Sequence, residues 1–375
     1  MAVQSDAGGK LIRKVVFRAD ASLEIGAGHV MRCLTLADAL RQRGVECHFI
    51  CREHSGHLVE WVRQKGYRVH VLPPGPAGPV EDDWVTHSAW LGGTQLDDVQ
   101  ACRAVLVGLR PDWLIVDHYA LDIRWERELK PYCGKLLVID DLADRSHECD
   151  MLLDQTLGRD EADYRPWVSG RCVVLCGVRY ALLRPEFAAL RIASLKRRSI
   201  PRLLEVLVTM GGVDKGNATG QVLEALRLCR LPARSRITVV LGASAPWLSE
   251  VRSLAQGMPW DTRVLAGVSN MGELMADSDL AVGAAGATSW ERCCLGLPTL
   301  MMVLADNQRL IASALEAAGA AWVLGGDGDA VARLPEYMAT LVSDPGCLNR
   351  MSAVAAGMLD GRGAEVVVER MEALK

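Results

Sequence analysis

The sequence lacks the features that mark membrane, secreted and nucleic-acid-binding proteins. No run approaches the roughly 20 apolar residues that a membrane-spanning helix needs. The net charge is −4 and no basic block stands out, so we expect no nucleic-acid partner. The first residues, MAVQSDAGGKLIRK, lack the apolar core of a signal peptide. We interpret them as a short disordered lead-in and expect a cytoplasmic protein.

The twelve cysteines lack the spacing of a metal site or a disulfide framework. They flank or bracket expected strands, or lie side by side on an expected helix, as in Cys47 and Cys51, Cys172 and Cys176, and Cys293 and Cys294. We therefore expect buried, reduced thiols. The sequence predicts no metal ion and no cofactor.

What the sequence does contain is an alternation of strand and helix patterns. A chain of 375 residues is too long for one ordinary core, which favours two domains. In the first half, apolar strand-like runs alternate with segments of helical periodicity. This rhythm predicts a parallel sheet covered on both faces. The expected strands are 14–19, 45–52, 67–73, 112–117 and 135–141, and the expected helices are 29–44, 57–66 and 95–110. A stretch rich in Pro and Gly, 73–93, is expected to be a loop.

The rhythm pauses at 180–201, which we interpret as a helix followed by a basic linker, and then restarts. The second half predicts strands at 203–210, 236–242, 262–267, 279–286 and 298–305, with helices between them. The expected fold is α/β, with two Rossmann-like domains that face a cleft. The expected boundaries are 13–190 for the first domain, 202–350 for the second and 351–375 for closing helices.

The stretch EIGAGHVMR joins the first expected strand to the first expected helix. Glycines at such a turn permit a close backbone approach, and ligands of open α/β sheets bind at this edge. The stretch is not a dinucleotide fingerprint, because Met31 occupies the place of the last glycine, and no Walker lysine follows. Near a helix start the imidazole of His29 is expected to be neutral and able to accept a proton. We predict a general base, the alternative being a histidine that only caps or packs.

Other polar residues follow strands at the same predicted edge. Asp20 lies at the end of the first strand. It has three possible roles: a substrate contact, a group that orients the site, or an aspartate of a turn or ion pair. Tyr119 follows the strand 112–117 with Asp117 and His118 beside it. The sequence does not rank these candidates.

The second half offers a matching half-site. Gly211, Gly212 and Asn217 follow its first strand, and GAAGATSWE follows a later one. In the latter, Thr288 and Ser289 suit contact with phosphate, and Glu291 suits acceptance of hydrogen bonds from ribose hydroxyls. ADNQ, ending at Gln308, closes the next strand. In this order the stretches predict a binding site for a nucleotide-sugar donor.

These motifs resemble the two-domain GT-B family of nucleotide-sugar enzymes, and within it the hydrolases of pseudaminic acid biosynthesis. The resemblance rests on FRADASLEIGAGHVMRCLTLADAL, IVDHY, YALLRPEF, TMGGVDKGN and GATSWERCCLGLPTLMMVLADNQ, and it runs from about Lys14 to at least Gln308. The stretch 73–93 departs from the family because it looks longer than the family needs.

The resemblance implies an enzyme that acts on UDP-2,4-diacetamido-2,4,6-trideoxy-β-L-altropyranose, with a place in flagellin glycosylation. The implied catalytic base is His29, within a GxGHxxR motif that also contains Gly28 and Arg32. Tyr119, Glu291, Asn307 and the adjoining Gln308 are the implied contacts with UDP or sugar.

The chemistry agrees with one positioned base. UDP is a good leaving group, so a base that activates water suffices, whereas hydrolysis of an ordinary glycosidic bond also needs a general acid. Backbone donors can stabilise the departing diphosphate without a metal. The expected reaction is hydrolysis at the anomeric carbon, with the UDP-sugar as the only predicted partner and no oligomeric state implied. The alternatives are a glycosyltransferase and a nucleotide-sugar-binding module without turnover.

Overall fold

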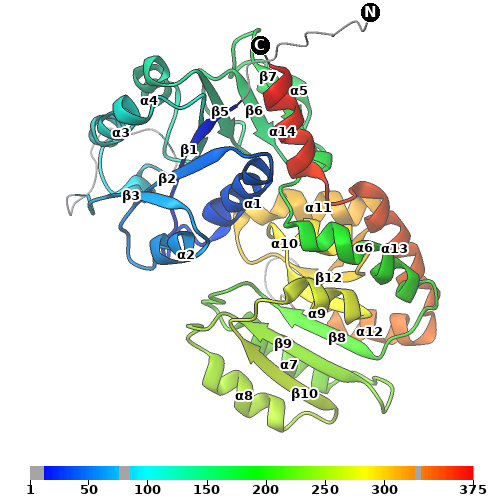
Figure 1. The fold of residues 1–375 in the computed structure, drawn as a ribbon. Coiled ribbons are helices and arrows are strands. Elements are labelled where there is room, and N and C mark those ends of the chain that lie inside the picture. The colour runs from blue at the N-terminus through cyan, green and yellow to red at the C-terminus, as the bar shows by residue number, and fades with distance from the viewer. Residues whose placement is uncertain (1–11, 76–84, 86, 326–330, 375) are drawn as a thin grey trace, which may run out of the picture. The chain divides into compact units, whose positions relative to one another are not determined.

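The chain forms two compact α/β units, each built around one parallel sheet (Figure 1). The computed structural model describes residues 12–75, 85, 87–325 and 331–374. Unit 1 comprises residues 1–182 and 363–375, and unit 2 comprises residues 183–362. The predicted fold class, two Rossmann-like α/β domains, is confirmed.

Unit 1 contains a seven-stranded sheet of order β3-β2-β1-β4-β5-β6-β7, with every pair of neighbours parallel. Its strands are β1 (Lys14–Ala19), β2 (Glu46–Arg52), β3 (Arg68–Leu72), β4 (Trp113–Asp117), β5 (Lys135–Ile139), β6 (Met151–Asp154) and β7 (Val173–Cys176). Its α-helices are α1 (Gly28–Gln42), α2 (Val59–Gln64), α3 (Gln95–Leu109), α4 (Ile123–Leu129), α5 (Glu161–Tyr164) and α14 (Gly363–Ala373), with short 3-10 turns η1 (Ser88–Leu91), η2 (Lys130–Tyr132) and η3 (Val178–Tyr180).

The two faces of this sheet carry separate apolar cores, because successive strand residues point to opposite faces. Val15 and Phe17 of β1 belong to a core that includes residues of α1 and α14, whereas Val16 belongs to a core that includes residues of α3. The residues of the central strands β1 and β4 are almost all buried, so the polar groups that these strands offer to a ligand lie at their ends.

Unit 2 repeats the plan with a six-stranded sheet of order β10-β9-β8-β11-β12-β13, again parallel throughout. Its strands are β8 (Glu205–Thr209), β9 (Arg236–Leu241), β10 (Asp261–Ala266), β11 (Leu280–Ala284), β12 (Thr299–Met302) and β13 (Ala321–Val323). Its helices are α6 (Pro185–Arg198), α7 (Ala218–Arg227), α8 (Leu248–Gln256), α9 (Met271–Asp277), α10 (Thr288–Cys294), α11 (Arg309–Ala318), α12 (Leu334–Ser343) and α13 (Gly346–Met358), with the 3-10 turn η4 (Asp306–Gln308).

Both sheets reverse their strand order at one place. In unit 1 the reversal lies between β1 and β4, and in unit 2 it lies between β8 and β11. The connections that leave two such strands run to opposite sides, which opens a crevice at their carboxyl ends where ligands of this architecture bind. The four strand ends at β1, β4, β8 and β11 therefore position the candidate groups.

The expected basic linker is instead the last turn of α6, a correction to the sequence-based interpretation. Arg198 is 8% exposed, and its guanidinium donates to backbone carbonyls of Ser194, Met275, Ala276 and Ser278. The units divide the chain after Leu182 and again after Arg362, so α6 and α13 lie in unit 2 and α14 lies in unit 1. The expected boundaries were 190, 202 and 350.

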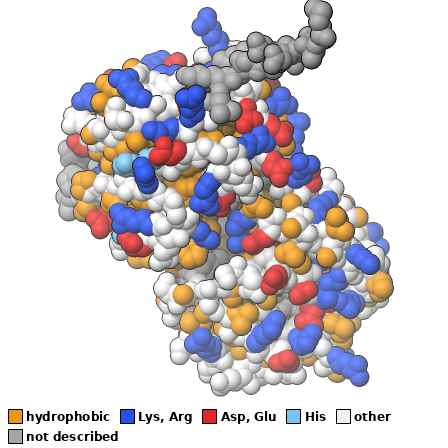
Figure 2. All heavy atoms as spheres, viewed as in Figure 1, with side chains coloured by type: hydrophobic (Ala, Val, Ile, Leu, Met, Phe, Trp, Pro, Cys, Tyr) orange, Lys and Arg blue, Asp and Glu red, His pale blue; other side chains and the backbone are white. Residues whose placement is uncertain are grey.

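The surface shows no single-sign field on the side drawn in Figure 2, where Lys and Arg side chains are interspersed with Asp and Glu. Within the described ranges, no helix has the length and apolar character to cross a bilayer. The twelve cysteines are free thiols, eight of them buried.

Candidate active site

The turn between β1 and α1 places His29 at the carboxyl edge of the unit 1 sheet. Gly26 has φ +79°, a left-handed conformation that a side chain would strain, and its N–H donates to the Ser22 carbonyl at 2.9 Å. Gly28 begins α1, and a Cβ on it would meet nothing within 4 Å, so the backbone there is open to a ligand. His29 follows in the first helical turn and is 7% exposed.

His29 forms a dyad with the carboxylate of Asp117, the last residue of β4. The distance from His29 Nδ1 to Asp117 Oδ1 is 2.6 Å. Burial alone would raise the pKa of Asp117, but the adjacent Arg32 guanidinium and His29 hold it well below its usual range. An ionised carboxylate only accepts hydrogen bonds, so Nδ1 carries the proton and Nε2 has the free lone pair. No described residue pairs with Nε2, which can therefore accept a proton from a ligand or water.

The guanidinium of Arg32 binds the Asp117 carboxylate of this dyad and is therefore not free to bind a ligand. It lies one turn beyond His29 on α1, and its Nε and Nη2 donate to the two oxygens of Asp117, each at 2.6 Å. Its Nη1 donates to Asp141 Oδ2 at 2.9 Å. The guanidinium is thus held by two carboxylates, which fixes the orientation of Asp117 beneath His29.

Tyr119 lies against His29 and is anchored by the same second carboxylate. Its ring meets the imidazole edge-on, with centroids 4.6 Å apart and an interplanar angle of 85°. Its hydroxyl donates to Asp141 Oδ1, and burial followed by the Asp141 charge raises the pKa of Tyr119 well above its usual value. The phenol therefore stays protonated, and its ring packs against His29 in a fixed orientation.

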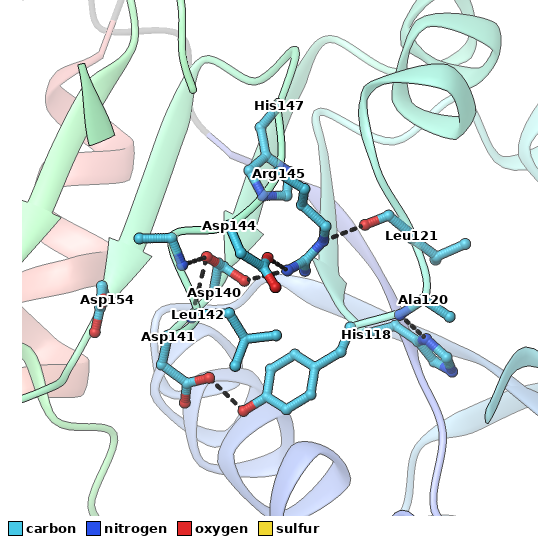
Figure 3. Close-up of polar contacts among 12 residues, drawn as sticks. His118, Ala120, Leu121, Asp140, Asp141, Leu142, Asp144, Arg145, His147 and Asp154 are labelled. Carbon is cyan, nitrogen blue, oxygen red and sulfur yellow. Dashed lines mark hydrogen bonds and ion pairs between the residues drawn. The ribbon is translucent and has the colours of Figure 1, made fainter. Parts of the chain in front are cut away.

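The loop after β5 holds Asp141 in place (Figure 3). Asp140 accepts the N–H groups of Leu142 and Ala143, and it pairs with Arg145 at 2.9 Å. Arg145 also donates to the carbonyl of Leu121 at 2.9 Å, which ties this loop to the segment after β4. The two loops that surround Tyr119 are therefore cross-linked.

Two further aromatic side chains lie beside Tyr119. Trp90 stacks on Tyr119 with ring centroids 5.8 Å apart, and His87 lies 4.3 Å from Trp90 and 5.4 Å from Tyr119. Burial lowers the pKa of His87, so this ring is neutral near neutral pH. Both come from the expected loop 73–93, of which residues 76–84 and 86 lie outside the described residues.

Asp20 is placed behind the site and is fully buried. Its Oδ1 accepts the backbone N–H of Arg52 and pairs with Arg18, each at 2.6 Å, while Oδ2 lies 3.3 Å from His118 Nε2 and 3.4 Å from His54 Nε2. Both carboxylate oxygens of Asp20 thus contact buried protein groups. Asp20 is therefore an ion-pair residue of the interior and not the substrate contact that was one of its expected roles. Asp20 joins the ends of β1, β2 and β4.

In unit 2, the turn after β8 carries Gly211 and Gly212. Gly211 has φ +96°, and a Cβ on either glycine would meet nothing within 4 Å. Asn217 instead serves as a cap, since its side chain accepts the N–H of Gly220 at 3.0 Å and donates to Glu250 at 2.9 Å. The glycines remain open to a ligand, whereas the amide of Asn217 is committed to α7.

The turn after β11 carries the second group of predicted contacts. Thr288 is partly exposed at the start of α10, while Ser289 is buried and its hydroxyl accepts from Arg292 at 3.0 Å. The Glu291 side chain is 16% exposed and lies 3.5 Å from Arg184. Burial, which outweighs the nearby arginines, raises the pKa of Glu291. Among these residues, Thr288 and Glu291 remain accessible.

The remaining predicted contacts lie on η4. The side chain of Asn307 lies outside the described residues. Gln308 accepts the backbone N–H of Leu304 at 2.9 Å, so its amide oxygen closes the loop after β12. In the part of the chain that the structure describes, no three His, Cys, Asp or Glu side chains are arranged to hold a metal ion.

Several known proteins are similar to this chain. Residues 206–365, most of unit 2, match the glycosyltransferase family 28 C-terminal domain. The UDP-2,4-diacetamido-2,4,6-trideoxy-β-L-altropyranose hydrolase of Campylobacter jejuni is 25% identical over 82% of this chain and 97% of its own length. The spore coat polysaccharide biosynthesis protein SpsG of Bacillus subtilis is 23% identical over 82% of each chain. The resemblance predicted from the motifs is thereby confirmed.

An uncharacterised protein of Methanocaldococcus jannaschii is 23% identical over 79% of this chain, which spans 57% of that protein's length. Among solved structures, MurG of Acinetobacter baumannii superposes with a TM-score of 0.67 at 15% identity, over 96% of this chain and 99% of MurG. The chain has the GT-B fold. The spinosyn rhamnosyltransferase SpnG, complexed with thymidine diphosphate, shares the GT-B fold with a TM-score of 0.63 at 18% identity, over 96% of this chain and all of its own.

Sequence reasoning missed two parts of the unit 1 site of this GT-B chain. Asp141 follows the buried run KLLVI, and the paired acids directly after that strand were the available signal. His87 and Trp90 gave no signal, because no periodicity links the stretch 73–93 to the end of β4. The sequence places Asp117 two residues before Tyr119 but does not identify it as the partner of His29.

Proposed function

We propose that the chain hydrolyses UDP-2,4-diacetamido-2,4,6-trideoxy-β-L-altropyranose to UDP and the free sugar, with His29 as the general base. The observation that carries this proposal is the His29–Asp117 contact of 2.6 Å at the β1–β4 switch point. A buried carboxylate that fixes the tautomer of an imidazole and stabilises the imidazolium is a recurrent device of enzymes that activate a nucleophile. The Campylobacter jejuni relative supports the choice of sugar.

In the proposed step, His29 Nε2 takes one proton from a water molecule while the water oxygen attacks the anomeric carbon. The bond between that carbon and the diphosphate oxygen breaks, and its electron pair leaves with UDP. Asp117 stabilises the imidazolium that forms, and the proton then passes to solvent. Tyr119 and Gly28 are the proposed sugar contacts from unit 1, with Arg32 and Asp20 as positioning groups.

Unit 2 is the proposed UDP-binding unit. Open backbone at Gly211 and Gly212 suits the diphosphate, and the accessible carboxylate of Glu291 suits the two ribose hydroxyls. Thr288, Asn307 and Gln308 complete the proposed contacts, and Asn217 and Ser289, whose side chains bond within unit 2, support the two turns. Backbone donors stabilise the leaving diphosphate in this scheme, and no metal takes part.

A glycosyltransferase is the second candidate, favoured by the family 28 match over residues 206–365. In that reaction the same base would deprotonate an acceptor hydroxyl instead of water. The two candidates differ in whether UDP release needs an acceptor. A binding module without turnover releases no UDP, whether or not an acceptor is present.

The deciding experiment incubates purified protein with the UDP-sugar alone, with excess EDTA, in water enriched in ¹⁸O. The hydrolase releases UDP without an acceptor, and the label enters the sugar because the anomeric carbon is attacked. Label in the phosphate of UDP would contradict attack at carbon. Release only after addition of an acceptor would favour the transferase.

A further inference from the structure

Arg292 is a buried cation that forms no ion pair with a described residue, although the charge of the neighbouring Glu291 acts on it. It lies on α10 and is 1% exposed, and its side chain runs back toward the start of the helix, where Nη2 donates to the Ala284 carbonyl at 2.7 Å and to the Ser289 hydroxyl at 3.0 Å. Its Nε and Nη1 have no hydrogen-bond partner among the described residues. Nor does any described carboxylate form an ion pair with it, since Glu291 pairs with Arg184.

Such an arrangement is costly. Burial lowers the pKa of Arg292 to about 10, which reflects the free energy lost when the guanidinium leaves water. Burial also lowers the pKa of Arg198 in the same unit to about 10, but its two terminal nitrogens donate to four backbone carbonyls and, among the described residues, only its Nε lacks a hydrogen-bond partner. A buried charge that remains unpaired destabilises the free protein unless a ligand compensates it.

The guanidinium lies at the carboxyl ends of β8 and β11. A Cβ on Gly283, in β11, would approach Arg292 Nη1 to 2.4 Å and the Thr209 carbonyl oxygen to 3.1 Å. Glycine at this position therefore leaves the space that the guanidinium uses. The adjoining turn at Gly286 and the turn at Gly211 are both open, since a Cβ on either would meet nothing within 4 Å.

We propose that Arg292 is a positioning residue whose buried charge attracts the diphosphate of the nucleotide to this strand edge. The inference rests on the proposed function and names the group in it that recognises the anion. Arg292 does not touch the ligand. It acts through its field, which is weakly screened in the interior, and through Ser289, whose hydroxyl it holds in one orientation.

The test compares UDP with uridine, which lacks the phosphates, by calorimetry on the full chain. Arg292→Met should weaken UDP binding at least tenfold and leave uridine binding within twofold. Arg292→Lys retains the charge and should keep the ratio of UDP to uridine affinity within threefold of the wild type. The free Arg292→Met protein should also melt at a higher temperature than the wild type, because an uncompensated charge has been removed.

Arg198→Met is the matched control. It should lower the melting temperature, because four carbonyls lose their donor, and leave UDP affinity unchanged. An equal loss of UDP and uridine binding in Arg292→Met, or unchanged UDP binding, would overturn the inference. If Arg292→Met does not fold, Arg292→Gln replaces it, and a Lys variant that loses UDP selectivity overturns the inference by itself.

Inorganic pyrophosphate separates this inference from the proposed function. It should raise the melting temperature of the wild type and leave that of Arg292→Met unchanged. A wild-type protein that binds pyrophosphate but not UDP would contradict only the proposed function. One that binds neither would contradict both.

Discussion

At the scale of single residues, the chemistry depends on which nitrogen of His29 carries the proton. The ionised Asp117 accepts from Nδ1, so Nε2 is the basic nitrogen. Arg32 in turn holds both oxygens of Asp117. The base is thus oriented by one carboxylate, and that carboxylate by one guanidinium.

Replacing His29 by Asn should abolish most turnover and spare nucleotide binding. The proposed UDP contacts lie in unit 2, so UDP affinity should stay at the wild-type value. Turnover should fall by about 10²–10⁴-fold, the range for loss of a positioned general base. Steady-state rates, UDP calorimetry and circular dichroism check this. A folded variant with near-wild-type turnover would mean that His29 is structural.

Replacing Asp117 by Asn tests the tautomer. An amide can donate to Nδ1, which leaves the proton on Nε2 and removes the base, so we expect turnover to fall by at least about 10²-fold. The control is Asp38→Asn on α1, the helix that carries His29; the Asp38 carboxylate accepts from Arg41 and Tyr67 away from the site. Equal activity in the Asp117 and Asp38 variants would refute a catalytic dyad.

The raised pKa of Glu291 predicts a pH dependence of nucleoside binding. As pH falls, Glu291 takes up its proton at a higher pH than an ordinary carboxyl, whose pKa is about 4.3, and ribose loses a charged acceptor. Uridine affinity should therefore decline while the pH is still above that value. Glu291→Ala should weaken UDP binding by about 1.5–3 kcal/mol per lost bond and remove the pH step.

Uridine is the appropriate probe for this effect because it has no phosphate to titrate. The exposed Glu336 of α12 provides the control variant, Glu336→Ala, which should retain the pH step. A wild-type uridine affinity that stays constant down to about pH 4 would exclude Glu291 from the ribose site.

At the scale of elements, sequence periodicity predicted what is repetitive and missed what is irregular. The run KVVFRA and the helix from His29 to Gly44 carry complete local signals, and both elements were placed within a residue or two. Strand β6 has four residues and β13 has three, too few for a period to emerge. The meeting of Asp117, Asp141 and Trp90 depends on strand order, which local patterns do not encode.

A buried charge cluster joins elements that the sequence treats separately. Asp98 of α3 accepts from Arg18 of β1, Arg52 of β2 and Trp125 of α4. Burial alone would raise its pKa, but Arg18 and Arg52 together outweigh burial and lower the pKa of Asp98 to about 2. The cluster fixes the polar ends of β1 and β2 behind the candidate site.

Asp98→Asn should lower the free energy of unfolding by about 3–5 kcal/mol, because two buried guanidinium groups lose a shared counter-charge. In the wild type, the contribution of Asp98 to the free energy of unfolding is fully present above the unfolded-state pKa of about 3.9. It is lost as the pH falls toward the folded-state pKa of about 2. Urea titrations at pH 7 and at acid pH check both statements. Asp97→Asn, an exposed neighbour in the same helix, should cost no more than about 1 kcal/mol. Equal losses in the two variants would contradict the cluster's role.

At the scale of the whole molecule, the chain passes from unit 1 to unit 2 after Leu182 and back to unit 1 after Arg362. Helix α14 closes the chain, yet it belongs to unit 1 with β1 and α1. Its buried side chains, Ala364, Val367, Val368 and Met371, are part of the same apolar core as Val15 and Phe17. The core of unit 1 therefore contains residues that are far apart in the sequence, from β1 to α14.

This connectivity predicts that the C-terminus supports catalysis and not nucleotide binding. The double variant Val367→Ala, Val368→Ala removes two fully buried side-chain contacts of α14, at a cost of about 2 kcal/mol each. The loss should fall on unit 1, so that turnover through His29 declines at a lower temperature while UDP affinity stays unchanged. Arg370→Ala, on the exposed side of the same helix, should change neither property. Thermal inactivation of turnover, followed beside UDP binding over the same temperature range, separates the two units. A variant in which both activities fail together would show that the units unfold as one, and α14 would then stabilise the entire chain.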